Sequence, residues 1–254
     1  MWFEQAKERI QKVEGDIGFL VKNLATGEVF SHQADDVFPS ASTIKVPILV
    51  SLLETAEQGK LKLCDPSPIP SGEVAGGCGI IQMLSEEIPF TLLDHAKMMI
   101  VLSDNAATNQ LIATLGIDEI NATCKKHGLN DTVLGRKMMD FEAKARGLDN
   151  FTSCQDMLSI FELLHKNSEQ YSVAIQILKQ QMLNDLLPTF TNRASYEFAH
   201  KTGELPGVRH DVGIMYLSDP IFVAFLSKSL SDEHAGIRLA NELGVLIYNA
   251  FSAK

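Results

Sequence analysis

The amino-acid sequence predicts a mixed α/β fold in which an antiparallel sheet, flanked by terminal helices, carries an inserted all-α lobe. Strand-like runs lie near both ends of the 254-residue chain, at 17–31 and 195–227. Between them, from about 42 to 187, apolar residues recur almost throughout at helical spacing. Strand segments that are distant in sequence can form one sheet, with the helices in separate layers.

The same pattern predicts the domain organisation. We expect one domain over 1–254, with a sheet lobe from about 1–41 and 190–254 and a helical lobe from about 42–189. The cleft between two such lobes is a common place for a small-molecule site. Functional residues are therefore expected where the two lobes meet.

The N-terminal segment predicts a helix followed by a β-hairpin. Apolar residues four, four and three apart share one helical face over 2–14: Trp2, Ala6, Ile10 and Val13. Two strands follow at 17–22 and 28–31, joined by the turn Ala25-Thr26-Gly27.

The remaining elements follow from the same periodicities. Six helices are predicted in the helical lobe, at 43–58, 91–102, 106–115, 117–127, 153–166 and 171–186. Loops rich in Gly, Pro and Ser interrupt them, notably 65–79 and 128–152. The C-terminal part predicts three strands and an amphipathic helix, at 195–202, 211–217, 221–227 and 232–251.

Composition narrows the partners and cofactors. A formal net charge of -10 disfavours nucleic acid and anionic membrane surfaces. The four cysteines show no C-x-x-C pair and the seven histidines lie singly, so no metal or other cofactor is expected. We expect a monomer that acts on a small molecule.

Targeting signals are also absent from the sequence pattern. No run approaches the roughly 18 uncharged apolar residues of a membrane span. Residues 1–10 are charged throughout and lack the apolar core of a signal peptide. The expected location is the cytoplasm, or outside it if an export signal has been removed.

Three short motifs occur in order where the lobes should meet. Ser42 and Lys45 open the first predicted helix of the helical lobe. Unpaired N–H groups and the helix dipole there favour developing negative charge at Ser42. Residues three apart share a helix face, and the apolar run 46–50 can lower the pKa of Lys45 enough for it to act as a base. The alternative is an N-cap serine followed by a solvent-facing lysine.

The second motif, Ser103-Asp104-Asn105, separates two predicted helices. Ser103 or Asp104 can simply cap the next helix. In the functional interpretation, Ser103 relays a proton to a leaving nitrogen, and the Asn105 amide positions Lys45 or the substrate.

The third motif, Lys201-Thr202-Gly203, ends a predicted strand. Lys201 can be an ordinary edge-strand charge, or it can bind a substrate carboxylate together with Thr202. Gly203 permits close approach of the backbone to a ligand.

Together the three motifs resemble those of the penicillin-recognising serine hydrolases, nearest the class A β-lactamases, and the likeness extends along nearly the whole chain. The resemblance implies a β-lactamase/D,D-peptidase-like fold and an acyl-enzyme mechanism. It implies roles for eight residues: Ser42 as nucleophile, Lys45 as general base, Ser103 as proton relay, Asn105 as positioning group, Lys201, Thr202 and Arg209 as carboxylate anchors, and the backbone N–H groups of Ser42 and Glu204, next to Gly203, as the oxyanion hole. Gly77-Cys78-Gly79-Ile80 resembles the cleft rim of that family.

The loop 134–143 departs from the class A pattern. Arg136 resembles the family's loop arginine, which would pair with an acid such as Asp149. The position of the deacylating glutamate then falls on Met138, which cannot take a proton. Asp140 and Glu142 are nearby acids that can replace it if the loop is rearranged, or they are solvated loop residues.

Three functions follow from an intact acylation motif without the usual deacylation base. The first is a class A-type serine hydrolase that opens β-lactams and deacylates slowly. The second is a D,D-peptidase or esterase acting on D-Ala-D-Ala-like or other acyl substrates. The third is a binder or sensor that β-lactams acylate once without turnover.

Overall fold

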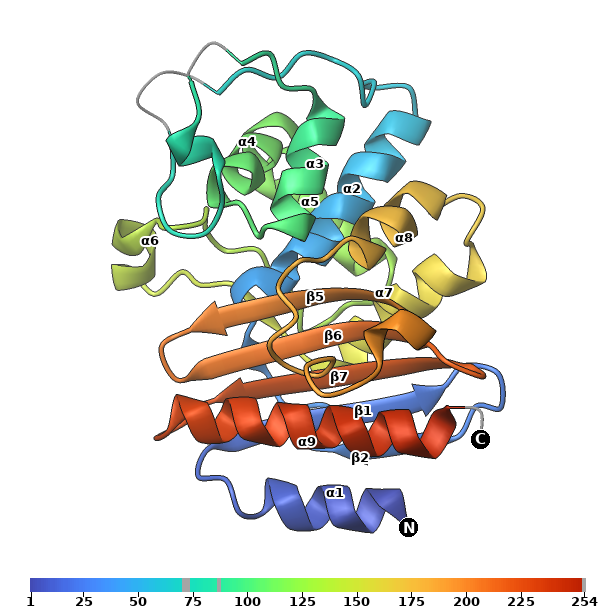
Figure 1. The fold of residues 1–254 in the computed structure, drawn as a ribbon. Helices are drawn as coiled ribbons and strands as arrows, with labels where there is room; N and C mark the ends of the chain where they lie inside the picture. The colour runs from blue at the N-terminus through green and yellow to red at the C-terminus, as the bar shows by residue number, and fades with distance from the viewer. Residues whose placement is uncertain (70–73, 86–87, 253–254) are drawn as a thin grey trace.

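The computed structural model describes residues 1–69, 74–85 and 88–252. Five antiparallel strands form the central sheet in the order β2-β1-β7-β6-β5. The strands are β1 (Asp16–Asn23), β2 (Val29–His32), β5 (Glu197–Leu205), β6 (Val208–Tyr216) and β7 (Pro220–Lys228). The N- and C-terminal strands thus share one sheet, as the sequence predicts, and the predicted fold class is confirmed (Figure 1).

Both faces of the sheet are buried, which explains why its central strands are apolar almost continuously rather than in alternation. β1 and β7 pair through Phe19 and Phe225, and residues of β7 contribute to two hydrophobic clusters. One cluster includes Phe222 and fills the space between sheet and helical part. The other includes Phe225 and lies under the terminal helices.

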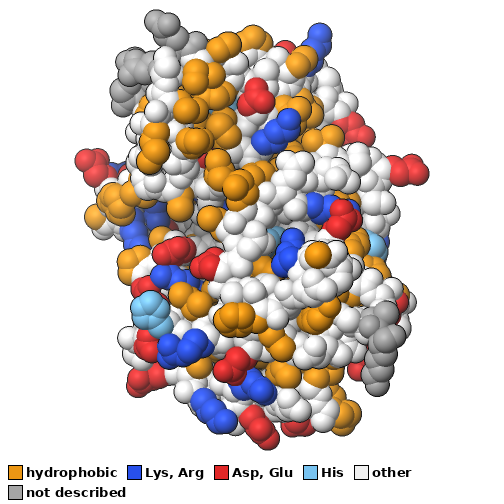
Figure 2. All heavy atoms as spheres, in the orientation of Figure 1, with side chains coloured by type: hydrophobic (Ala, Val, Ile, Leu, Met, Phe, Trp, Pro, Cys, Tyr) orange, Lys and Arg blue, Asp and Glu red, His pale blue; other side chains and the backbone are white. Residues whose placement is uncertain are grey.

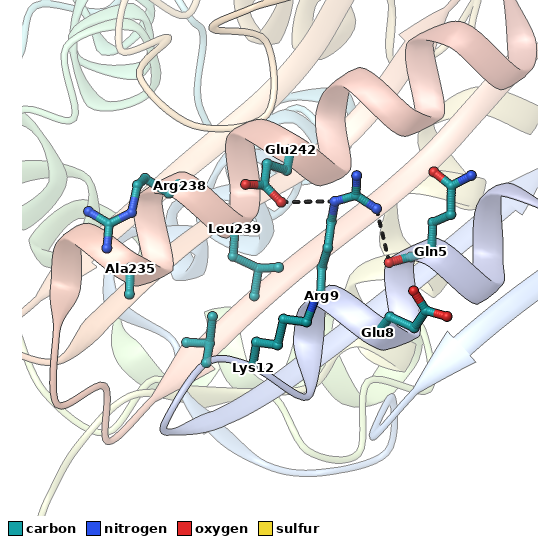
Figure 3. A pocket seen from close by; sticks show the side chains of 9 residues that line it. Gln5, Glu8, Arg9, Lys12, Ala235, Arg238, Leu239 and Glu242 are labelled. Atoms are coloured by element: carbon teal, nitrogen blue, oxygen red, sulfur yellow. Dashed lines mark hydrogen bonds and ion pairs between the residues drawn. The ribbon is translucent and has the colours of Figure 1, made fainter.

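The terminal helices α1 (Trp2–Ile10) and α9 (Glu233–Phe251) pack together on one side of the sheet (Figure 1). A groove of about 600 Å³ runs between them, where Arg9 Nε donates to Glu242 at 2.8 Å (Figure 3). Helix α1 ends four residues before the predicted end. The chain turns there to enter β1, through Gly15 at φ 143°.

The helical part contains most of the predicted helices: α2 (Lys45–Glu57), α3 (Leu92–Val101), α4 (Asn105–Leu115), α5 (Ile117–Lys126), α7 (Cys154–Lys166) and α8 (Ser172–Lys179). Helix α8 ends seven residues before the predicted 186. Its Leu178 packs into the cluster on the helical side, whereas Leu186 and Leu187 pack under the terminal helices. The chain must leave the helix to pass from one cluster to the other.

Several short elements escaped prediction because they are too brief to show a period. The two-residue strands β3 (Phe38–Pro39) and β4 (Phe151–Thr152) pair with each other. Helix α6 (Phe141–Ala145) lies within the predicted loop 128–152. The 3₁₀ segments are η1 (Ala41–Ile44), η2 (Ile81–Met83) and η3 (Arg193–Ser195).

β5 continues three residues past the predicted end at 202, because the tight turn to β6 comes only at Pro206 and Gly207. The predicted loop 65–79 lies partly outside the described residues. Across 1–69, 74–85 and 88–252, no helix has both the length and the apolar character needed to cross a membrane.

Candidate active site

Ser42 lies in η1, directly before α2, in a tightly constrained stretch of backbone. Ala41 has φ 46°, a conformation that non-glycine residues rarely adopt and that tends to occur at functional sites. Gly203 of β5 faces this stretch so closely that a Cβ there would lie 3.2 Å from the Ser42 nitrogen. The glycine therefore allows β5 and the start of α2 to meet.

Lys45 is the first residue of α2, and its side chain is fully buried. Its Nζ lies 2.7 Å from the Ser103 carbonyl oxygen, 3.1 Å from Ser103 Oγ and 3.0 Å from Asn105 Oδ1. Burial, and then the nearby charge of Lys201, hold the pKa of the Lys45 amine well below its usual range. A neutral amine can accept a proton, so the arrangement suits a general base.

Both predicted interpretations of the Ser103-Asp104-Asn105 motif, helix capping and contact with Lys45, apply to it. Ser103 has φ 54°, which turns its carbonyl and hydroxyl toward Lys45. Asp104 caps α4 by accepting from the Ala107 nitrogen at 2.9 Å. Its second oxygen accepts from the nitrogens of Ile80 and Ile81, at 2.7 and 2.9 Å. The aspartate is thus structural, while the residues on either side of it contact Lys45.

The rim segment Gly77-Cys78-Gly79-Ile80 is held against this motif. The Asn105 nitrogen donates to the Cys78 carbonyl at 3.0 Å. Gly79, at φ 116°, lies where a Cβ would meet Asp104 at 2.2 Å. The glycine is therefore required for the rim to approach α4.

The Glu204 backbone N–H points away from the sheet, toward the open edge beside which η1 lies. Glu204 pairs with Arg209 of β6, and Arg209 directs its own N–H to Ser227 of β7. Glu204 and Arg209 are therefore a non-hydrogen-bonded pair of the antiparallel ladder, in which the two residues exchange no backbone hydrogen bonds. Because β5 is the edge strand, the Glu204 N–H faces the open edge where η1 lies. The structure thus brings this N–H and the Ser42 N–H to the same side of the cleft.

Lys201 and Thr202 lie on the same stretch of β5. Lys201 is fully buried, and its Nζ donates to the Thr202 carbonyl at 2.9 Å. Burial lowers the pKa of Lys201 to about 7, although Asp211 partly opposes the shift. Near neutral pH the amine is therefore charged in only about half of the molecules.

Two cavities meet at Ser42. The larger, of about 680 Å³, extends from Ser42 between the 136–150 loop and the β5–β6 turn. The smaller, of about 330 Å³, is lined by Ser42, Ser103, Thr202 and the segment 182–186. Basic and acidic side chains gather on this side of the molecule, between α6 and the β5–β6 turn (Figure 2).

Arg209 lines both cavities, but its guanidinium is already engaged. Nη1 donates to the carbonyls of Leu205 and Val208. Nη2 forms ion pairs with Glu233 and with Glu204. The expected carboxylate anchor is therefore in place on the cavity wall but bound to two carboxylates of the protein itself.

The loop after α5 is ordered by interactions that the sequence only partly indicates. Arg136 pairs with Asp149, as expected, with Nε 2.9 Å from Oδ1. Asn150 accepts from the nitrogens of Gly135 and Arg136, and Asn109 exchanges two hydrogen bonds with the Met138 backbone. Neither asparagine was among the predicted residues, and each follows from the fold rather than from a motif.

Met138 is 9% exposed and lines the larger cavity, at the position expected for the deacylating glutamate. Asp140 caps α6 by accepting from the Ala143 nitrogen at 2.9 Å. Glu142 is exposed in the first turn of that helix. Neither acid is among the described residues on the walls of the two cavities. A role for either as deacylation base stays a prediction.

A profile of the Beta-lactamase enzyme family matches residues 3–251, which is nearly the whole chain. The chain belongs to the beta-lactamase enzyme family. It is accordingly an enzyme, a hydrolase that acts through a serine on small molecules.

Individual relatives of this family member are distant. The ROB-1 beta-lactamase of Haemophilus influenzae is 25% identical over 241 residues, covering 88% of this chain and 75% of the relative. A beta-lactamase of Rhodobacter capsulatus is 28% identical over 123 residues, and the match spans 44% of this chain and 40% of that protein.

Solved structures are close in fold. A beta-lactamase from Sphaerobacter thermophilus superposes with a TM-score of 0.89 at 26% identity, covering 98% of this chain and 96% of that one. PBP-A gives a TM-score of 0.87 at 26% identity, covering 98% and 95%. An ancestral class A beta-lactamase, at 22% identity and TM-score 0.88, shares the fold over 99% of this chain.

Proposed function

We propose that this family member opens β-lactams through an acyl-enzyme on Ser42 and releases the product slowly. The observation that carries the proposal is the buried Lys45 amine, held between Ser103 and Asn105 one 3₁₀ turn after Ser42. A serine hydroxyl is a weak nucleophile unless a neighbouring base activates it. Lys45, with its lowered pKa, supplies that base.

Acylation proceeds in two steps, formation of the tetrahedral intermediate and its collapse. Lys45 takes the proton of Ser42 as Oγ bonds to the lactam carbonyl carbon, and the N–H groups of Ser42 and Glu204 stabilise the oxyanion. When the C–N bond breaks, Ser103 passes a proton to the leaving nitrogen and recovers one from Lys45, 3.1 Å away. Lys201 and Thr202 bind the substrate carboxylate, and Asn105 holds Lys45 in place.

Deacylation is the slow step in this proposal. It needs a base that activates water, and a general base is typically worth about 10²–10⁴ in rate. Met138 lines the cavity where that base is expected and cannot accept a proton. The acyl-enzyme therefore accumulates.

Met138 also favours a second candidate, a D,D-peptidase or esterase with the same acylation chemistry. A PBP-A variant has been solved as an acyl-enzyme complex with penicillin G, and PBP-A resembles this chain at 26% identity. A sensor that is acylated once would share the same acylation step but would not deacylate. The three functions differ in turnover and in substrate, not in the first chemical step.

Intact-mass spectrometry after mixing with a penicillin tests the proposal, followed over minutes to hours beside absorbance of a chromogenic cephalosporin. We expect a long-lived adduct on Ser42 with slow, multiple turnovers. Adduct without turnover, together with release of D-Ala from D-Ala-D-Ala peptides, supports the peptidase. Hydrolysis that survives in Ser42→Ala at an unchanged rate contradicts the assignment of the nucleophile.

A further inference from the structure

The smaller cavity beside Ser42 has an unusual charge for a site that should receive a carboxylate. Its described lining holds two carboxylates, Asp185 and Glu204, and Arg209 as its one cation. Asp185 is an exposed residue of the segment that follows α8. Among the side chains that line this cavity, negative charge therefore exceeds positive charge.

Arg209 has little capacity left for a ligand. A guanidinium has five N–H donors. Two donate to the carbonyls of Leu205 and Val208 and a third to the carboxylate of Glu233, and Nη2 also forms an ion pair with Glu204. Glu233 is itself fixed, because its other oxygen accepts from the Gly207 nitrogen at 2.7 Å. A substrate carboxylate would have to displace a glutamate to bind Arg209 at Nη2.

Glu204 lies beside the reacting atoms. Its own N–H faces the open sheet edge beside η1, which contains Ser42, and its side chain is on the same face of β5 as Thr202, two residues earlier. The carboxylate is 69% exposed and lines both cavities. A group that Thr202 holds next to the scissile bond is consequently close to this negative charge.

We propose that Glu204 selects substrates by the charge of their leaving portion, favouring a cationic or uncharged group in the smaller cavity over a carboxylate. The inference rests on the acyl-enzyme function proposed above and ranks its substrates: acyl compounds with an ammonium or uncharged group close to the scissile bond react faster than those with a carboxylate there. Lys201 offsets the repulsion only in part, since it is buried and half-charged near pH 7. Water screens the exposed Glu204 carboxylate, so we expect a preference of about tenfold.

Three benzoylglycyl thioesters that differ only in the leaving thiol test this selection. The thiols are thiocholine, which is cationic, 3,3-dimethylbutanethiol, which is its uncharged isostere, and 3-mercaptopropionate, which is anionic. Ser42 Oγ bonds to the acyl carbon, the C–S bond breaks and the thiol leaves with the proton. Loss of thioester absorbance gives kcat/KM without a thiol reagent, which would label the exposed Cys64 and Cys78. Each value is divided by the hydroxide hydrolysis rate of the same ester.

The matched variants are Glu204→Gln and Glu197→Gln. Glu197 is also on β5 and is similarly exposed, at 64%, but lies roughly 23 Å away along the strand. That distance exceeds the screening length of about 8–10 Å. In the unchanged protein and in Glu197→Gln we expect the cationic ester to exceed the anionic one about tenfold, decreasing in high salt. In Glu204→Gln the ratio should fall to within about twofold, and acylation by penicillin should speed up.

The outcomes separate the two proposals. Equal kcat/KM for the cationic and anionic esters, with a Ser42 adduct from each, overturns the selection and leaves the acyl-enzyme function standing. A cation preference that persists in Glu204→Gln overturns the assignment to Glu204. If no ester or penicillin acylates Ser42, both proposals fail together.

Discussion

In the proposed mechanism, the side chain of Met138 is the reason why acylation is fast and deacylation slow. Its backbone is held by Asn109 through hydrogen bonds of 2.7 and 3.0 Å, and its side chain lines the larger cavity. A substitution there changes the cavity wall without releasing the loop. We expect Met138→Glu to shorten the lifetime of the penicillin adduct at least tenfold, since a general base is worth about 10²–10⁴.

The measurement is the decay of the acyl-enzyme by intact mass, with Met138→Gln as control. Glutamine has nearly the size of glutamate but cannot act as a base at neutral pH. Equal decay in the two variants would mean that position 138 does not reach the deacylating water.

We expect Lys201 to make the binding of anionic substrates dependent on pH. Its pKa is lowered to about 7, so the amine is charged below that pH and becomes neutral above it. The attraction for a carboxylate is accordingly present at pH 6 and lost by pH 8. In Glu204→Gln we expect kcat/KM for the anionic thioester, divided by that for the uncharged one, to fall severalfold across this range.

Dividing one kcat/KM by the other removes the effect of Lys45 ionisation, because that ionisation changes the rate of both esters alike. A ratio that stays flat from pH 6 to 8 would show that Lys201 does not contact the leaving portion of the ester.

The sequence predicted most of the functional residues of this site, but not all of the residues that bind them. Ser42, Lys45 and Ser103 stand in three ordered short motifs, and the pairing of Arg136 with Asp149 was implied by the resemblance to the class A β-lactamases. The engagement of Arg209 could not be predicted. It depends on the tight turn that aligns Glu204 and on the placement of α9, which brings in Glu233 from 24 positions away.

At the level of elements, the contact between the rim segment and α4 depends on Gly79. A Cβ at this position would lie 2.2 Å from Asp104, and φ is 116°. We expect Gly79→Ala to lower the free energy of unfolding by about 3 kcal/mol or more, because it combines backbone strain with a clash. Gly128 is the matched control, with φ 72° and nothing within 4 Å of its added Cβ.

Gly128→Ala should cost about 1–2 kcal/mol, the strain of a left-handed residue alone. Denaturant unfolding of the two variants measures the difference. Equal losses would mean that the rim shifts away from Asp104 without cost.

Long periodic elements were predictable, and their ends were less so. Helices with apolar faces, such as α7 and α9, begin and end close to the predicted positions. Helix α8 stops early because the residues after it belong to a cluster on the other face of the sheet, which no local pattern indicates. The ladder of β3 and β4 is two residues long and has no period to detect.

For the whole molecule, we propose that the sheet and helical parts form one domain and unfold together. β7 contributes to the clusters on both faces of the sheet, so neither cluster can open alone. Trp2, the one tryptophan of the chain, packs against Phe30 and Phe251 and reports on the terminal helices and sheet. Far-ultraviolet circular dichroism reports mainly on the helical part.

Thermal or denaturant transitions followed by the two signals should therefore coincide. Tryptophan fluorescence that changes well before the helical signal would show that the terminal helices and sheet edge unfold as a separate unit.

The pairing of β1 with β7 also determines when this molecule can finish folding. Phe19 faces Phe225, a partner about 200 residues later in the chain. Contacts of such long range slow folding because a large loop must close first. During synthesis, the hairpin of β1 and β2 leaves the ribosome with one strand edge unpaired until nearly all of the chain has followed, and it stays exposed to aggregation for that time.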